Sequence, residues 1–198
     1  STLLKAIAGV VTPKAGAITL SGTAIAGRAP EEIARMGFSM VPEGRHVFGA
    51  LTVDENLRLG IGIRQDRDRA ARDLEDIYAV FPMLKQRRDA PAGLLSGGQQ
   101  QMLVIGRALM AGPKLLAIDE PSLGLAPKVI DDVYATLLKL RDARGLTLLI
   151  VEQSSTRATM TGGRMVLLRG GELVLEGDAR ELSRGEALKQ AYFGYGDH

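Results

Sequence analysis

Leu95-Ser96-Gly97-Gly98-Gln99, followed after a short predicted helix by Leu115-Leu116-Ala117-Ile118-Asp119-Glu120, is the stretch of this chain that decides the fold. The first segment combines small residues with the free backbone N–H groups of a helix start. The second segment is an aliphatic strand that ends in two carboxylates. Together these features predict a site that holds a nucleoside triphosphate and its magnesium ion.

The helix start at Ser96 has a clear local pattern. Ser96 occupies an N-cap position and Gln99 follows three residues later, which is a capping-box spacing. Gly97 and Gly98 each cost about 1 kcal/mol relative to alanine in a helix. A plain cap does not need them, whereas a phosphate that approaches the helix start closely does. An ordinary capped helix is the alternative interpretation.

The apolar run Leu115 to Ile118 is typical of a strand buried on both faces in a parallel sheet. Asp119 and Glu120 follow it, and neighbouring side chains of a strand point to opposite sides. The two carboxylates are therefore expected to do different work. A surface turn that happens to carry two acids is the alternative.

Composition excludes several classes of protein. A chain of 198 residues fits one domain, and its net charge of +2 without a run of five like charges gives poor support for nucleic-acid binding. The absence of cysteine excludes disulfides and suits a reducing cytosol. No apolar run approaches the roughly 20 residues that a membrane-spanning helix needs.

The order of elements predicts an α/β fold with a mostly parallel sheet core, an inserted helical subdomain and a short antiparallel β part. We expect one domain, residues 1–198, with the α/β core in 1–49 and 106–198 and the helical subdomain in 50–105. The capping box Thr52-Val53-Asp54-Glu55 marks one helix start. The other helices are expected at 2–9, 30–35, 66–81, from Ser96 to a stop at Gly112-Pro113, at 127–144 and at 185–193. The strands are expected at 16–22, 37–41, 115–118, 146–151, 164–169 and 172–176. The last two strands flank the hairpin turn Gly170-Gly171.

In this order and spacing, LSGGQ and LLAIDEP resemble the signature and Walker B motifs of the ABC-type ATPases, which are P-loop NTPases. Ser1-Thr2-Leu3-Leu4 is similar to the end of the family's phosphate-binding loop, which closes with G-K-S-T. We therefore expect the glycines and lysine of that loop to lie upstream of Ser1, and the chain as given to hydrolyse ATP poorly. A simple Ser-Thr helix cap is the alternative.

The resemblance implies a set of site residues for ATP and Mg²⁺. It implies that Ser1 and Asp119 hold the metal ion, that Glu120 acts as general base and that Gln153 stands at the switch position beside the terminal phosphate. The residues implied to bind nucleotide are Ser1, Thr2, Glu43, Ser96, Gly97, Gly98 and Gln99. In the family the signature helix touches nucleotide held by an opposite protomer, so the resemblance implies a head-to-tail dimer.

Three positions depart from the general family pattern. Glu43 stands where glutamine is usual, Ala126 where aspartate precedes proline, and Gln153 where histidine is usual. Decay to a weak or inactive ATPase is one interpretation. The other is that these variants, together with the ending around 186–194, resemble the second ATP-binding subunit of branched-chain amino-acid importers. Urea and short-amide importers share much of the pattern.

The resemblance also implies partners and a location. It implies a cytoplasmic subunit, peripheral on the inner face of the cell membrane, that pairs with a second ATP-binding subunit in a homo- or heterodimer. It implies integral-membrane permease subunits, met by the segment 43–57, and an indirect link to a solute-binding protein, with no nucleic acid. A soluble ABC protein that serves DNA repair or ribosomes, and an assembly or regulatory module without turnover, are the alternatives from other classes.

Overall fold

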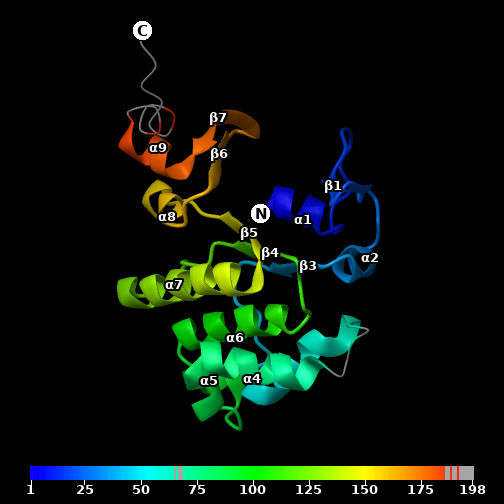
Figure 1. The fold of residues 1–198 in the computed structure, drawn as a ribbon, viewed down its shortest axis with the longest axis vertical. Helices are drawn as coiled ribbons and strands as arrows, with labels where there is room; N and C mark the ends of the chain where they lie inside the picture. The colour runs from blue at the N-terminus through cyan, green and yellow to red at the C-terminus, as the bar shows by residue number, and fades with distance from the viewer. Residues whose placement is uncertain (65, 67–68, 186–187, 189–190, 192–198) are drawn as a thin grey trace. The chain divides into compact units, whose positions relative to one another are not determined.

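The computed structural model describes residues 1–64, 66, 69–185, 188 and 191 of the chain (Figure 1). These residues form two compact units, Ser1–Val151 and Glu152–His198, which are described separately below.

A three-stranded parallel sheet organises the first unit. Its strand order is β3 (Phe38–Val41), β4 (Leu115–Asp119), β5 (Thr147–Val151). The central strand β4 is buried on both faces, because Leu116 and Ile118 pack into one hydrophobic cluster and Ala117 into another. The predicted doubly buried strand is therefore confirmed.

Helices cover both faces of this sheet. Helix α7 (Pro127–Arg144) lies along one face and contributes Ile130, Val133, Leu137 and Leu140 to the buried residues, as predicted (Figure 1). Helices α1 (Thr2–Ile7) and α2 (Pro30–Arg35) contribute Leu4 and Ile33 to the cluster on the other face. Gly145 ends α7 in the left-handed conformation at φ 61, which suits a residue without a Cβ atom.

The strand predicted at 16–22 is wrong in extent. The structure has two short antiparallel strands instead, β1 (Thr19–Leu20) and β2 (Thr23–Ala24). Ser21 and Gly22 between them have φ of 49° and 80°. Positive φ at both central residues is typical of a two-residue type I′ hairpin turn, so the chain reverses at the point where the sequence pattern suggested continuation.

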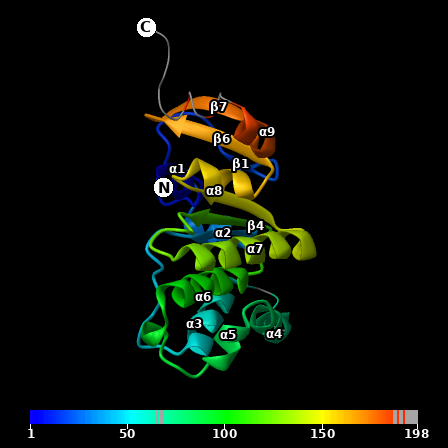
Figure 2. The ribbon, with the colours of Figure 1, turned by 90° about the vertical axis from the view of Figure 1, so that its left-hand side faces the viewer.

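The segment inserted between β3 and β4 is mostly helical, as expected. It contains α3 (Val53–Leu59), η1 (Gly60–Ile63), α4 (Ala70–Val80), α5 (Pro82–Gln86), η3 (Ala92–Leu94) and α6 (Gly97–Leu109). Helices α3, α4, α5 and α6 lie together in Figure 2. Its apolar side chains share one cluster with those of β4 and α7. The boundaries of a helical subdomain at residues 50 and 105 stay a prediction.

Helix α4 begins later than predicted, at Ala70 and not at Asp66. The carboxylate of Asp66 accepts hydrogen bonds of 2.8 Å from Nε and Nη2 of Arg64. The buried Arg64 guanidinium also binds Asp73 within α4 and donates to the carbonyl of Met110 at 3.2 Å. Asp66 is therefore a partner of Arg64 ahead of α4, and its pKa is lowered to about 2 by the hydrogen bonds from Arg64.

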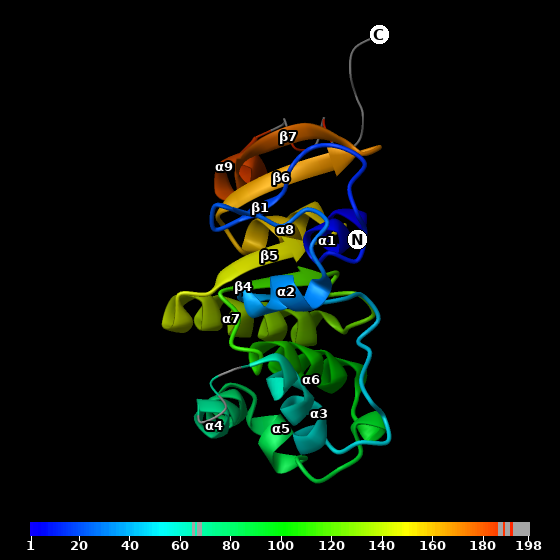
Figure 3. The ribbon, with the colours of Figure 1, turned by 90° about the vertical axis from the view of Figure 1, so that its right-hand side faces the viewer.

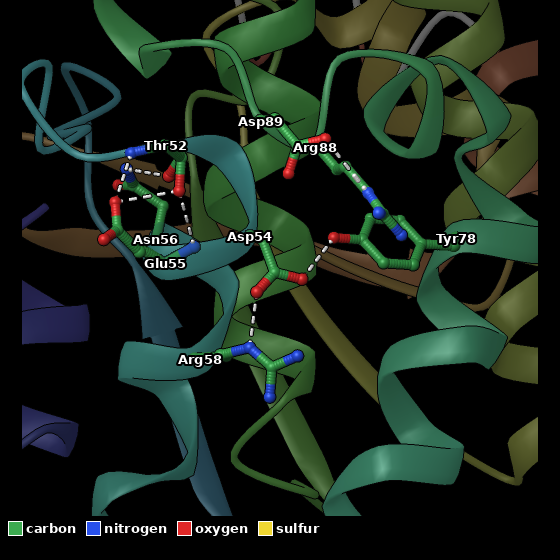
Figure 4. Close-up of polar contacts among 8 residues, drawn as sticks. All are labelled: Thr52, Asp54, Glu55, Asn56, Arg58, Tyr78, Arg88 and Asp89. Atoms are coloured by element: carbon green, nitrogen blue, oxygen red, sulfur yellow. Dashed lines mark hydrogen bonds and ion pairs between the residues drawn. The ribbon is translucent and has the colours of Figure 1, made fainter.

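A polar network ties α3 to α4 (Figure 4). The Tyr78 hydroxyl donates to Oδ1 of Asp54 at 2.7 Å, and Arg58 pairs with the other carboxylate oxygen. Burial, followed by the hydrogen bond to Asp54, raises the pKa of Tyr78. Burial alone would raise the pKa of Asp54, but the hydrogen bonds from Arg58 and Tyr78 outweigh it and hold that pKa below its usual value. The network fixes the start of α3 against α4.

The second unit contains the predicted hairpin, with β6 (Arg164–Arg169) and β7 (Glu172–Asp178) side by side in Figure 3. The sequence analysis missed two helices of this unit, α8 (Ser155–Met160) and α9 (Ala179–Arg184). Their N-caps, Ser154 and Asp178, are the signal that would have found them. Most of the helix predicted at 185–193 lies outside the described residues.

Candidate functional site

The carboxyl ends of the three parallel strands meet at one edge of the sheet. The last residues of β3, β4 and β5 are Val41, Asp119 and Val151, with Val41 paired to Ile118 and Asp119 paired to Val151. Ligands of open α/β sheets bind outside this edge. The candidate carboxylates that follow these strands therefore share one end of the first unit.

Asp119 is the buried carboxylate of this edge. Only 2% of the residue is exposed, and its Oδ1 atom has no hydrogen-bond partner. The main-chain nitrogen of Ser1 lies 3.7 Å from that oxygen. Ser1 stands at the N-cap of α1, but its side chain makes no capping hydrogen bond. The structure thus brings together the two residues expected to hold a metal ion.

A buried carboxylate oxygen that accepts no hydrogen bond is the type of group that a divalent cation or its water would satisfy. Among the described residues no cluster of three or more His, Cys, Asp or Glu is close enough to hold a metal ion. Mg²⁺ is commonly held by one or two protein ligands, substrate phosphates and water. The pair of Ser1 and Asp119 therefore fits that ion.

Glu120 does not continue the strand as the sequence suggested. Strand β4 ends at Asp119, and Glu120 has the left-handed φ of 52° although it is not glycine. Its N–H donates to the Val151 carbonyl at 2.9 Å, and its own carbonyl accepts from Leu123 N–H at 3.2 Å. The carboxylate is thus oriented by a tight turn, and strained backbone of this type clusters at functional sites.

The signature turn has the predicted capping box. The N–H of Ser96 donates to Oε1 of Gln99 at 3.0 Å, and the N–H of Gln99 donates to Oγ of Ser96 at 3.4 Å. The side chain of Gln99 is therefore engaged in the cap of α6. The first helical residues, Gly97 and Gly98, present their amides at the positive end of a 13-residue helix.

The two glycines also have packing reasons that the sequence analysis did not foresee. A methyl group at Gly98 would lie 2.4 Å from Cγ1 of Val129 in α7, far inside van der Waals contact. A methyl group at Gly97 would lie 2.8 Å from Nη1 of Arg45. The absence of a Cβ atom at Gly98 is therefore already explained by the contact between α6 and α7.

The remaining predicted residues are exposed. Thr2 is the first residue of α1, Glu43 lies in the turn after β3, and Gln153 belongs to the second unit. Within the described part of the chain, no hydrogen bond or ion pair joins Ser96–Gln99 to Ser1 or Asp119. The sequence analysis did not select Arg45, although it quoted the segment that contains it.

A groove of about 430 Å³ lies between the end of β3, η1 and the last turns of α6. Phe48, whose exposed fraction is 53%, forms part of its lining. The Arg107 guanidinium lies 5.1 Å from the Phe48 ring centre and donates to the His46 carbonyl at 2.8 Å. Burial lowers the pKa of Arg107. Apolar surface with one oriented cation is suited to binding a protein segment.

Comparison with known proteins gives consistent matches. The profile of the ABC transporter family matches residues 1–123. The high-affinity branched-chain amino acid transport ATP-binding protein BraG of Pseudomonas aeruginosa is 40% identical over 194 residues, covering 98% of this chain and 82% of that protein. The probable branched-chain amino acid transport ATP-binding protein LivF of Archaeoglobus fulgidus is 34% identical over 197 residues, covering 100% of this chain and 83% of that protein.

Solved structures show the same fold. The ADP conformation of MJ1267, an ATP-binding cassette of an ABC transporter, superposes with a TM-score of 0.82 at 25% sequence identity, covering 98% of this chain and 82% of that one. The described residues include no helix whose length and apolar character would let it cross a membrane.

Proposed function

The chain belongs to the ABC transporter family, as an ATP-binding subunit, and on this premise we propose that it hydrolyses ATP to power an importer of branched-chain amino acids. The ABC-type fold that the sequence resembles is confirmed. The observation that carries the hydrolytic part is the buried Asp119, whose Oδ1 accepts no hydrogen bond and lies 3.7 Å from the main-chain nitrogen of Ser1. The names of the two branched-chain amino-acid relatives support the solute class.

Asp119 and the Ser1 hydroxyl would hold Mg²⁺, which supplies positive charge to the phosphates when it is bound. Glu120, turned out of β4 by its left-handed backbone, would accept a hydrogen bond from the attacking water and orient it. Gln153 would donate to the terminal phosphate, and it cannot carry a proton. Positioning and charge stabilisation then account for most of the chemistry, as in other phosphoryl transfers.

The start of α6 would serve a second nucleotide site. The amides of Gly97 and Gly98 lie at the positive end of the helix and would bind the terminal phosphate of ATP held by a partner subunit. That partner would be a second copy or a related ATP-binding subunit in a head-to-tail dimer. Thr2, Glu43, Ser96 and Gln99 complete the set of proposed nucleotide-contacting residues.

The groove beside Phe48 and Arg107 would receive a cytoplasmic helix of the permease. This assignment is supported by the exposed Phe48 ring, which belongs to the 43–57 segment and lines the groove. The subunit would then be peripheral on the inner face of the cell membrane, and a solute-binding protein would act on it only through the permease.

Substitution of the proposed base tests the hydrolytic assignment. We expect Glu120→Gln in the whole protein to lower ATP turnover by on the order of 10²–10⁴-fold, because the amide cannot act as a base, while ATP-bound dimers accumulate. Phosphate release and size-exclusion chromatography with ATP measure both effects. Undiminished turnover would remove Glu120 from this role. Uptake of leucine, urea and short amides by the reconstituted transporter separates the candidate solutes.

A further inference from the structure

Arg45 connects three segments that lie far apart in the sequence. A methyl group built on Gly97 would lie 2.8, 2.9 and 3.0 Å from Nη1, Cζ and Nη2 of Arg45, so the face of the guanidinium covers this glycine. Nη2 also donates to the Gly124 carbonyl at 3.2 Å. One side chain from the loop after β3 therefore contacts both the signature turn and the loop after β4.

The backbone that presents this side chain is strained. Gly44, Arg45 and His46 have consecutive left-handed φ values of 93°, 65° and 50°, and two of these residues carry a Cβ atom. Such conformations persist only where the surroundings hold them. The His46 carbonyl is held by Arg107 at 2.8 Å, and the His46 N–H donates to the Gly44 carbonyl at 2.7 Å.

Local electrostatics does not explain the placement. The guanidinium covers the first residue of α6, at the positive end of the helix dipole, where a cation is unfavourable. Within the described ranges, no carboxylate forms an ion pair with Arg45. The position of the Arg45 guanidinium is therefore fixed by the strained backbone of its loop and by its hydrogen bond to the Gly124 carbonyl.

The loop after β3 and the segment that leads into the signature turn are also joined by backbone hydrogen bonds. The N–H groups of Ala92 and Gly93 donate to the carbonyls of Leu51 and Gly49 at 2.8 and 3.0 Å. A methyl group at Gly93 would lie 3.2 Å from the Gly49 carbonyl oxygen, so the two backbones approach each other closely here. Arg45 is thus the contact at one end of a continuous attachment between the loop after β3 and the segment that leads into the signature turn.

We propose that Arg45 is a positioning residue for ATP hydrolysis, which holds the Ser96–Gly98 turn and the loop after β4 in the relative placement that a bound phosphate requires. The inference rests on the proposed function, because that placement matters only if the amides of Gly97 and Gly98 bind phosphate. It goes beyond the proposed function by assigning a role to a side chain that does not itself touch the nucleotide.

The contact is tested first without any activity measurement. In a double-mutant cycle, Gly97→Ala should lower the thermal midpoint by a few degrees when Arg45 is present, since the new methyl group would displace the guanidinium. In an Arg45→Ala background, Gly97→Ala should lower the thermal midpoint by less or should raise it, because the methyl group no longer meets a guanidinium. Equal shifts in both backgrounds would overturn the contact.

The role is tested by ATPase kinetics of the whole protein assembled with its permease. We expect Arg45→Ala to lower kcat per folded molecule by roughly 10- to 100-fold, with KM for ATP nearly unchanged. Arg45→Lys should not restore kcat, because lysine lacks the planar fork that covers Gly97 and reaches Gly124. Arg28→Ala is the matched control, since the Arg28 side chain is exposed and its Nε donates to the nearby Ala24 carbonyl at 2.7 Å, a contact remote from the signature turn in the sequence.

Two results would overturn the positioning role. In one, kcat per folded molecule is unchanged in Arg45→Ala, which leaves Arg45 a merely structural contact. In the other, Arg45→Lys restores kcat, which assigns the effect to charge and not to geometry. If the wild-type assembly itself does not hydrolyse ATP, the proposed function fails, whereas the stability cycle still reports on the contact.

Discussion

Gly98 shows how one residue serves two elements. It lies in the first turn of α6, at the positive end of the helix, and its missing Cβ atom admits Val129 of α7. Gly97 has the corresponding relation to Arg45. At this scale close packing against Val129 explains the glycine at position 98, whereas Gly97 meets the movable end of the Arg45 side chain.

Substitution of Gly98 tests the packing role. We expect Gly98→Ala to lower the free energy of unfolding by about 1–3 kcal/mol, because a methyl group would overlap the Val129 side chain. Val129→Ala should recover part of this loss by making room. Urea unfolding measures both changes. Gly62→Ala is the matched control, since a methyl group at Gly62 meets no atom of the described residues within 4 Å; equal losses at the two positions would contradict the prediction.

At the scale of elements, polar side chains fix where helices begin. Thr52 caps α3 by accepting from the N–H of Glu55 at 3.2 Å, and Glu55 accepts from the Thr52 N–H at 2.7 Å. Asp54 in the same turn joins α3 to Tyr78 of α4 (Figure 4). The orientation of the helical segment therefore depends on ionised carboxylates as well as on the shared hydrophobic cluster.

The Asp54 network predicts an acid-dependent loss of stability. Because hydrogen bonds from Arg58 and Tyr78 hold the folded-state pKa of Asp54 below the ordinary 3.8, its contribution is complete above pH 3.8 and is lost as pH falls through the folded-state pKa. Arg88 acts in the same direction through its charge. We expect Asp54→Asn to have a lower free energy of unfolding than the wild type near neutral pH. Below pH 4 the free energy of unfolding should fall less steeply in this variant than in the wild type.

Urea unfolding between pH 3 and 7 measures this dependence. Asp131→Asn is a suitable control, because Asp131 is exposed on α7 and the structure describes no ion pair for it. If the free energy of unfolding fell equally with decreasing pH in the wild type and in Asp54→Asn, ionisation of Asp54 would contribute nothing to stability.

At the scale of the whole molecule, the Ser1–Asp119 pair predicts metal-dependent stabilisation by nucleotide. We expect ATP with Mg²⁺ to raise the thermal midpoint of the whole protein, since a ligand at roughly 100 times its Kd adds about 2.7 kcal/mol to the folded state. In the wild type, EDTA should reduce the rise in thermal midpoint that ATP causes, because it removes Mg²⁺. Asp119→Asn should reduce that rise by the same amount. A shift that is equal with Mg²⁺ and with EDTA would contradict the metal assignment.

The sequence by itself determined the local structure of this protein. The capping boxes at Thr52 and Ser96, the doubly buried strand at 115–118, which extends one residue further to Asp119, and the hairpin at Gly170-Gly171 were all predicted. These features depend on hydrogen bonds between residues three apart and on runs of apolar side chains. Both patterns involve residues that are close together in the chain, so a single sequence suffices to find them.

Only the tertiary structure decided how these elements meet. The left-handed backbone of Glu120, the short β1–β2 hairpin and the fit of Gly98 against Val129 are set by neighbours that the pattern of residues does not identify. Arg45 and Gly124 are 79 positions apart, yet their contact joins the loops after β3 and β4. Packing energies between such distant segments depend on the exact backbone approach, which no local propensity encodes.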